Sequence, residues 1–180
     1  MEKGSKGILV TGCGRSGTGY MAALLTAAGC PVGHEKDGPN GQVSWRLGAS
    51  NREELAAWSP VVHLVRQPLR CISSCQTFQE NTWKWIETVA PEIPFSDPLP
   101  VRCMKYWLHW NLRAGKVADF RVRLEDLYEG LGYTILTDEH VPVDTNSRRG
   151  EYTPITIDQL IAADPATFAA VNLLATSYGY

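Results

Sequence analysis

Short apolar runs, each followed by a segment of helical periodicity, recur along the chain. Residues 7–12 and 61–65 are such runs, the first ending in Gly12 and the second followed by Arg66-Gln67-Pro68. Continuous apolar runs of this length are typical of parallel strands that are buried on both faces. Apolar residues then recur at helical spacing over 18–28 and over 69–78. The pattern therefore predicts a strand, a loop and a helix, twice in succession.

The second half of the chain continues this alternation. The proline-rich residues 91–100 predict a loop, and residues 101–117 place apolar side chains on one face of a helix. Residues 120–124 alternate as a strand and lead into a helix. Thr156 with Gln159 has the capping-box pattern, and Asp164 precedes a proline, so two further helices are predicted.

Strands that alternate with helices predict an α/β fold, with a mainly parallel sheet flanked by helices. The 180 residues, 44% of them hydrophobic and 20% charged, suffice for one packed core, so we expect a single domain over residues 1–180. Ligands of such sheets bind beyond the carboxyl ends of the strands.

Charge and hydropathy narrow the classes of partner. The formal net charge of −2 leaves no broad basic face, so a nucleic-acid partner is not expected. The first residues contain no apolar run long enough for a signal peptide, and no later stretch approaches the roughly 20 apolar residues of a spanning helix. We expect a soluble, cytoplasmic protein without a membrane partner.

The five cysteines favour reduced, packed thiols because they are odd in number and lie in apolar or glycine-rich segments. Cys71 and Cys75 are four residues apart on a predicted helix. No histidine or third cysteine stands near them in the sequence to complete a tetrahedral zinc site. The sequence therefore predicts no bound metal.

A glycine-rich loop between the first strand and the first helix is the most informative feature. It reads Gly-Cys-Gly-Arg-Ser-Gly-Thr-Gly over residues 12–19. Glycines let the main chain approach an anion, and the amides at a helix N-terminus bind phosphate. A tight turn without a ligand is the alternative explanation for the glycines. When the loop is aligned to the P-loop of nucleoside triphosphatases, Thr18 stands where that loop has its lysine, and Gly19 stands where it has the magnesium-binding hydroxyl. The sequence is therefore not that of an ATPase loop.

A second anion-binding pattern follows the second strand. Arg66 is followed by Pro68, and Ser74 is the eighth residue after Arg66. Together the patterns resemble the sulfotransferase family. Residues 14–18 with Tyr20 resemble its 5′-phosphosulfate loop, and Arg66-x-Pro68 with Ser74 resembles its 3′-phosphate motif. Weaker resemblance extends through residues 33–35, 123–127 and 177–180.

The resemblance implies a P-loop NTPase-like fold and metal-independent transfer of a sulfuryl group from 3′-phosphoadenosine 5′-phosphosulfate to an acceptor hydroxyl or amine. Arg66 and Ser74 would hold the 3′-phosphate. Residues of the first loop and helix would hold the 5′-phosphosulfate, namely Gly14, Arg15, Ser16, Gly17, Thr18, Gly19 and Tyr20.

Several positions depart from the family pattern. Arg15 stands where many relatives have a catalytic lysine, and it can still stabilise charge on the leaving phosphate oxygen. Gln67 replaces the usual Asp or Asn, and Gly19 replaces a second threonine. Arg148-Arg149-Gly150 resembles the late basic loop that closes over the 3′-phosphate, although a solvated basic turn has the same pattern.

Sulfuryl transfer needs a base that takes the proton of the acceptor. Glu35 is our first candidate and His34 the second, with a packed histidine and a surface carboxylate as the alternative. His63 lies inside an apolar run and is predicted to be a core residue. Glu125 and Asp126 head a helix and are predicted to be structural.

Two other functions stay open. A non-catalytic binder of nucleotide or sulfate would keep the loop and Arg66 but have no acceptor pocket. A small P-loop kinase would need the lysine and the magnesium-binding hydroxyl that the loop lacks. If the protein is an enzyme, its acceptor is a sugar, a small alcohol or phenol, or a peptide tyrosine.

Overall fold

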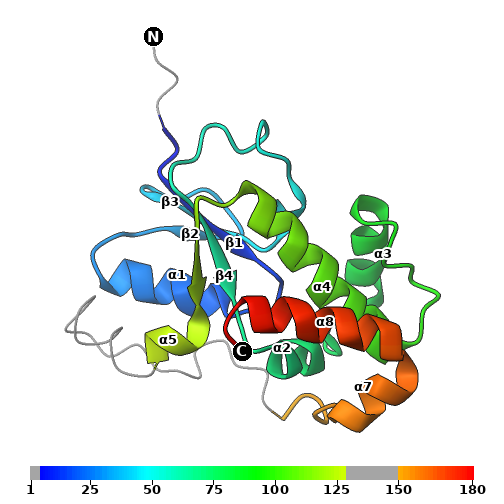
Figure 1. Cartoon of the computed structure of the whole chain (residues 1–180). Coiled ribbons are helices and arrows are strands. Elements are labelled where there is room, and N and C mark those ends of the chain that lie inside the picture. The colour runs from blue at the N-terminus through cyan, green and yellow to red at the C-terminus, as the bar shows by residue number, and fades with distance from the viewer. Residues whose placement is uncertain (1–4, 129–149) are drawn as a thin grey trace.

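The centre of the molecule is a five-stranded sheet in which all neighbouring strands run parallel (Figure 1). A computed structural model of the chain describes residues 5–128 and 150–180. The strand order is β2-β3-β1-β4-β5. The bounds are Ile8–Gly12 for β1, Gly33–His34 for β2, Gly41–Val43 for β3, Val61–Val65 for β4 and Phe120–Arg123 for β5. The fold is therefore α/β, consistent with a P-loop-like architecture.

Helices cover both faces of the sheet (Figure 1). Their bounds are Thr18–Ala27 for α1, Pro68–Cys75 for α2, Glu80–Val89 for α3, Leu99–Val117 for α4, Leu124–Tyr128 for α5, Ile157–Ala163 for α7 and Pro165–Ser177 for α8. A short 3-10 helix, η1, covers Arg46–Ala49. None of the helices in the described part of the chain has the length and apolar character needed to cross a bilayer.

The core is divided by the sheet. On one side, α1 packs on β1, β3 and β4 through Tyr20, Leu24, Val10 and Leu64. On the other side, α4 lies against the sheet and against α2, α7 and α8. Its fully buried Trp107 and Trp110 fill the larger cluster. The central strands β1 and β4 are thus buried on both faces, which explains their mainly apolar sequences.

The main predicted elements are confirmed, and four of the described elements were not predicted. β4 has the predicted bounds. The first and last residues of β1, α1 and α2 differ from the predicted ones by no more than three positions. The unpredicted elements are β2, β3, η1 and α3. The predicted loop over 91–100 is too long, because α4 begins at Leu99 with Pro100 in its first turn, where the missing N–H of proline has no cost.

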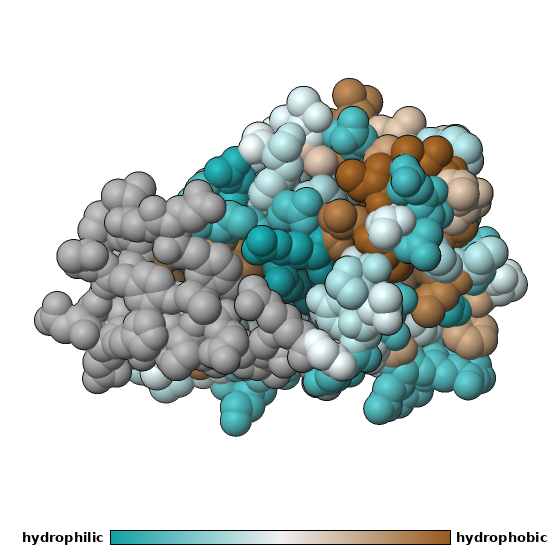
Figure 2. All heavy atoms as spheres, turned by 90° about the horizontal axis from the view of Figure 1, so that it is seen from below, coloured by the Kyte–Doolittle hydropathy of each residue, from teal (hydrophilic) through white to brown (hydrophobic). Residues whose placement is uncertain are grey.

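The strands run downward in Figure 1, so their carboxyl ends lie on the side that Figure 2 views from below. Hydrophilic side chains cross the middle of this face, and a group of hydrophobic side chains lies beside them (Figure 2). The glycine-rich loop, Glu35 and Arg66 all follow the carboxyl end of a strand. The predicted site residues that the structure describes are therefore gathered at one edge of the sheet.

Candidate functional site

The glycine-rich loop turns from β1 into α1 through two left-handed residues. Arg15 has φ 71° and Gly17, the residue before α1, has φ 93°. A side chain at Gly17 would also place its Cβ 2.6 Å from the Cδ2 atom of Leu124. The residue at the helix entrance thus has to be glycine and supplies no capping side chain. The first amides of α1 are left for an anion.

The Ser16 hydroxyl is the clearest sign that the loop is built for a ligand. Ser16 is 1% exposed, and its Oγ has no hydrogen-bond partner among the described residues. Its backbone N–H donates to the Cys13 carbonyl at 3.1 Å, which fixes the turn. A buried hydroxyl without a partner is costly and uncommon. An anion held by the neighbouring amides would accept a hydrogen bond from this hydroxyl.

The inner side of the loop is held by α4. The Gly14 N–H donates to the Tyr106 hydroxyl at 2.8 Å. A Cβ on Gly14 would lie 2.7 Å from the same oxygen, so this glycine allows a close approach of the loop to the tyrosine. Burial is the main reason that the pKa of Tyr106 is raised well above its ordinary value. Tyr106 is therefore a neutral hydroxyl that fixes the loop.

The two predicted phosphate-binding arginines meet at the loop. The Arg66 Nη1 donates to the Arg15 carbonyl at 2.8 Å. The Arg15 Nη2 lies 3.5 Å from the Thr77 carbonyl, and its guanidinium lies 4.7 Å from the centre of the Phe78 ring. The Thr77 hydroxyl in turn donates to the Ser74 carbonyl at 2.8 Å. The loop, the end of β4 and the end of α2 thus form one positively charged region.

Gln67 has a structural role that its sequence position did not reveal. Its side-chain oxygen accepts from the Arg70 N–H at 2.8 Å and caps α2. Its own N–H donates to the Glu125 carboxylate at 3.0 Å. The other oxygen of Glu125 accepts from the Tyr180 hydroxyl at 2.7 Å. Glu125 is therefore structural, as predicted, and joins β4, α5 and the end of the chain.

The two base candidates lie at the carboxyl end of β2, beside the loop. Glu35 accepts from the Ser44 hydroxyl at 2.7 Å and from the Trp45 N–H at 3.0 Å. His34 Nε2 lies 3.3 Å from Thr18 Oγ1 and 3.8 Å from Glu35 Oε1. Both side chains are partly exposed, 27% for Glu35 and 37% for His34. A fixed, solvent-accessible carboxylate thus lies next to the first turn of α1.

Other predicted positions fall outside this group. His63 is 1% exposed and its Nε2 lies 3.0 Å from Asn111 Oδ1, which confirms it as a core residue. Arg148 and Arg149 lie outside the described residues. Gly150 is exposed and has a left-handed φ of 88°.

The segment that follows Gly150 lies along α2, beside the predicted 3′-phosphate motif. The Gln76 side chain donates to the Thr153 carbonyl at 2.9 Å, and the Ile155 N–H donates to Ser73 Oγ at 3.0 Å. Ser73 and Gln76 flank Ser74 on either side in the sequence. The chain therefore returns to α2 directly after the predicted basic loop.

An aromatic wall, which the sequence analysis missed, stands beside Glu35 and Arg15. Trp45 lies 5.6 Å from Phe78 and 5.3 Å from Trp85, measured between ring centres. All three are partly exposed. Trp45 directly follows Ser44 at the end of β3. An aromatic residue just after a strand was therefore the one feature of the sequence that could have indicated the wall. The wall can contact an apolar or ring-shaped group next to the carboxylate.

Three cysteines meet beneath the loop, although the sequence showed no third cysteine near Cys71 and Cys75. The sulfur atoms of Cys13, Cys71 and Cys75 lie within 4.8 Å of one another.

Comparison of the chain with protein-family models and with curated protein sequences found no match.

Proposed function

We propose that the protein is a metal-independent sulfotransferase, which moves a sulfuryl group from 3′-phosphoadenosine 5′-phosphosulfate to an acceptor hydroxyl or amine. The observation that carries the proposal is the buried Ser16 hydroxyl, which has no hydrogen-bond partner among residues 5–128 and 150–180 and lies in a loop whose amides open at the N-terminus of α1. A 5′-phosphosulfate supplies several acceptor oxygens to satisfy it and the amides. Thr18, in the first turn of α1, contributes a second hydroxyl.

In this proposal the two arginines bind different ends of the sulfuryl donor, 3′-phosphoadenosine 5′-phosphosulfate. Arg66 uses one N–H for the Arg15 carbonyl, and a guanidinium has four more to offer a 3′-phosphate. Ser74 is its partner in that role. Arg15 stabilises the negative charge that develops on the bridging phosphate oxygen as the bond from sulfur to that oxygen breaks.

Glu35 acts as the base in the proposed reaction. The acceptor oxygen or nitrogen forms a bond to sulfur and gives its proton to the carboxylate. The bonds from Ser44 and Trp45 fix the direction of the carboxylate while leaving lone pairs on both oxygens. The aromatic wall of Trp45, Phe78 and Trp85 then contacts the acceptor next to its reacting group.

The same residues argue against a kinase. A P-loop kinase needs a lysine at the phosphates and a hydroxyl that binds magnesium, and the loop has Thr18 and Gly19 at these positions. β4 is followed by Arg66 and not by a carboxylate that could hold the metal through water. Magnesium dependence of turnover would therefore contradict the proposal.

Nucleotide binding without magnesium tests the donor site. We expect 3′-phosphoadenosine 5′-phosphate, the product nucleotide, to raise the melting temperature in excess chelator, and ATP to raise it much less. At a hundred times its dissociation constant, a ligand stabilises the folded state by about 2.7 kcal/mol, a readable shift for a domain of this size. No shift at millimolar product nucleotide would reject the donor assignment. A shift without turnover on any acceptor would leave a binding protein and reject the enzyme.

A further inference from the structure

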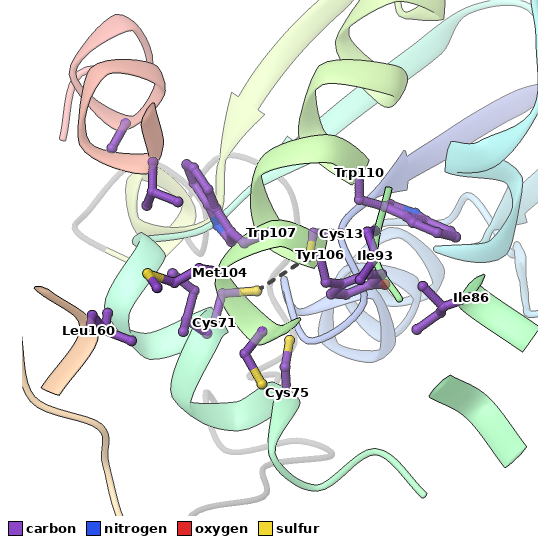
Figure 3. Close-up of a cluster of buried hydrophobic side chains, with 14 of the residues drawn as sticks. Cys13, Cys71, Cys75, Ile86, Ile93, Met104, Tyr106, Trp107, Trp110 and Leu160 are labelled. Atoms are coloured by element: carbon purple, nitrogen blue, oxygen red, sulfur yellow. Dashed lines mark hydrogen bonds between the residues drawn. The ribbon is translucent and has the colours of Figure 1, made fainter. Parts of the chain in front are cut away.

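The Cys13 side chain of the glycine-rich loop meets two cysteine side chains of α2 (Figure 3). Cys13 follows β1, and Cys71 and Cys75 lie one turn apart on α2. The Sγ atoms of Cys13 and Cys71 are 3.8 Å apart, and all three sulfur atoms lie within 4.8 Å of one another. Each of the three residues is fully buried. The triad is thus a preformed group of sulfur atoms in a dry site.

The spacing of the sulfur atoms fits a shared metal ion better than a disulfide. A disulfide brings two sulfur atoms to about 2.05 Å and leaves the third one unused. A metal held by three sulfur ligands with bonds of about 2.3 Å and angles near 120° sets these ligands about 4.0 Å apart. The Sγ atoms of Cys13 and Cys71, at 3.8 Å, already lie close to this separation. The other pairs need to close by no more than about 1 Å.

The surroundings of the triad favour negative charge on it. Burial raises the pKa of the Cys71 thiol, but hydrogen bonds with Cys13 and Cys75 and the charges of Arg66 and Arg15 outweigh burial and hold this pKa well below its ordinary value. Burial is the main reason that the pKa values of the Cys13 and Cys75 thiols lie well above their ordinary values. In the metal-free protein the Cys71 and Cys75 thiols donate to the Gly14 carbonyl, at 3.4 and 3.9 Å, so both sulfur atoms already lie against the loop. The two arginines offset part of the charge that metal binding would add.

We propose that Cys13, Cys71 and Cys75 bind one soft, thiophilic metal ion, for which monovalent copper is the best match. No histidine, carboxylate or fourth cysteine joins the triad within residues 5–128 and 150–180. Structural zinc sites have four ligands, whereas monovalent copper is selected by thiolates and accepts three of them. Binding releases the proton of each thiol to solvent and forms three metal–sulfur bonds without any change of oxidation state.

The metal would join the loop to α2. Cys13 lies two residues before Arg15, and Cys75 is adjacent to Ser74. A shared ion therefore fixes the two anion-binding segments relative to each other, as a structural metal does between segments that fold together. Because the triad is fully buried, we expect the ion to enter while the chain folds or while the loop opens.

The test is an anaerobic titration of the full-length, fully reduced chain with Cu(I) against a chromophoric Cu(I) chelator. We expect the protein to withdraw one equivalent of Cu(I) per chain. Cys13→Ser, Cys71→Ser and Cys75→Ser should each weaken binding by at least tenfold. Cys103→Ser, which removes an equally buried thiol outside the triad, and Cys30→Ser should leave binding unchanged.

X-ray absorption on the wild-type protein with one equivalent of Cu(I) makes the test independent of whether the variants fold. Three sulfur neighbours around copper support the site. Two sulfur neighbours, nitrogen or oxygen neighbours, or no Cu(I) withdrawn from the chelator would overturn the proposal. It would also be overturned by equal losses in the Cys103 variant, by preference for Zn²⁺ over Cu(I), or by a disulfide between Cys13 and Cys71 in protein purified without reductant.

Discussion

Replacing Arg66 with alanine should separate recognition of the 3′-phosphate from the rest of nucleotide binding. Arg66 is half-buried, and its guanidinium is held at the loop by the 2.8 Å bond to the Arg15 carbonyl. Its remaining N–H donors are thus positioned before the nucleotide binds, which reduces the entropy lost on binding. Hydrogen bonds that involve a charged group contribute about 1.5–3 kcal/mol, or roughly a 10- to 150-fold change in affinity.

We expect Arg66→Ala to weaken binding of 3′-phosphoadenosine 5′-phosphate by this factor. Binding of adenosine 5′-phosphate, which lacks the 3′-phosphate, should change far less. Loss of the bond from the charged guanidinium to the Arg15 carbonyl also costs about 1.5–3 kcal/mol of folding stability, so denaturation curves have to accompany the binding data.

Isothermal titration calorimetry of both nucleotides with the wild-type and variant proteins measures the selectivity directly. Arg70→Ala is the matched control, because Arg70 lies on the exposed side of α2 and the two residues carry the same charge. The reasoning is refuted if Arg66→Ala keeps the wild-type preference for the 3′-phosphorylated nucleotide. It is also refuted if Arg70→Ala loses that preference to the same extent.

Four further substitutions test other parts of the site and the core. Glu35→Gln should lower turnover by about 10²-fold or more while the affinity for the nucleotide stays the same, and a larger loss in His34→Asn would transfer the role of base to His34. Ser16→Ala should weaken nucleotide binding without lowering the stability of the free protein, because it removes a buried hydroxyl that has no partner among the described residues; lower stability would contradict this. Burial lowers the pKa of His63 to about 4, below its ordinary value of 6.5, so the stability it contributes is complete above pH 6.5 and lost as the pH falls towards 4. The wild type should lose up to about 3 kcal/mol across this range, and His63→Gln, measured by denaturation at each pH, should lose less.

The sequence predicted those parts of the fold that have a continuous local pattern. β4 has four apolar residues and the buried His63, and its bounds were predicted correctly, because a strand buried on both faces is mainly apolar along its whole length. β2 and β3 span two and three residues and contain glycines, so no periodicity marks them. Their place in the sheet depends on pairing with β1, which is a long-range contact.

The site was predictable wherever a motif carried it. The loop over residues 12–19 and Arg66 each follow an apolar run, and parallel strands bring their carboxyl ends to the same edge of the sheet. The aromatic wall and the cysteine triad were not predictable in this way. Trp45 depends on the unpredicted β3, and Cys13 reaches Cys71 across 58 residues of sequence. Contacts of this kind depend on the packing of whole elements and leave no local pattern.

The most direct test of the proposed activity is transfer of label from ³⁵S-labelled 3′-phosphoadenosine 5′-phosphosulfate to a library of sugars, phenols, small alcohols and tyrosine peptides in excess chelator. We predict that one class of acceptor becomes labelled, and that 3′-phosphoadenosine 5′-phosphate is released in equal amount only when this acceptor is present. Arg15→Ala should reduce this turnover by about 10²- to 10³-fold, as expected when a donor to the transition-state charge is removed. Donor binding without transfer to any acceptor, or transfer that requires magnesium, would contradict the proposal.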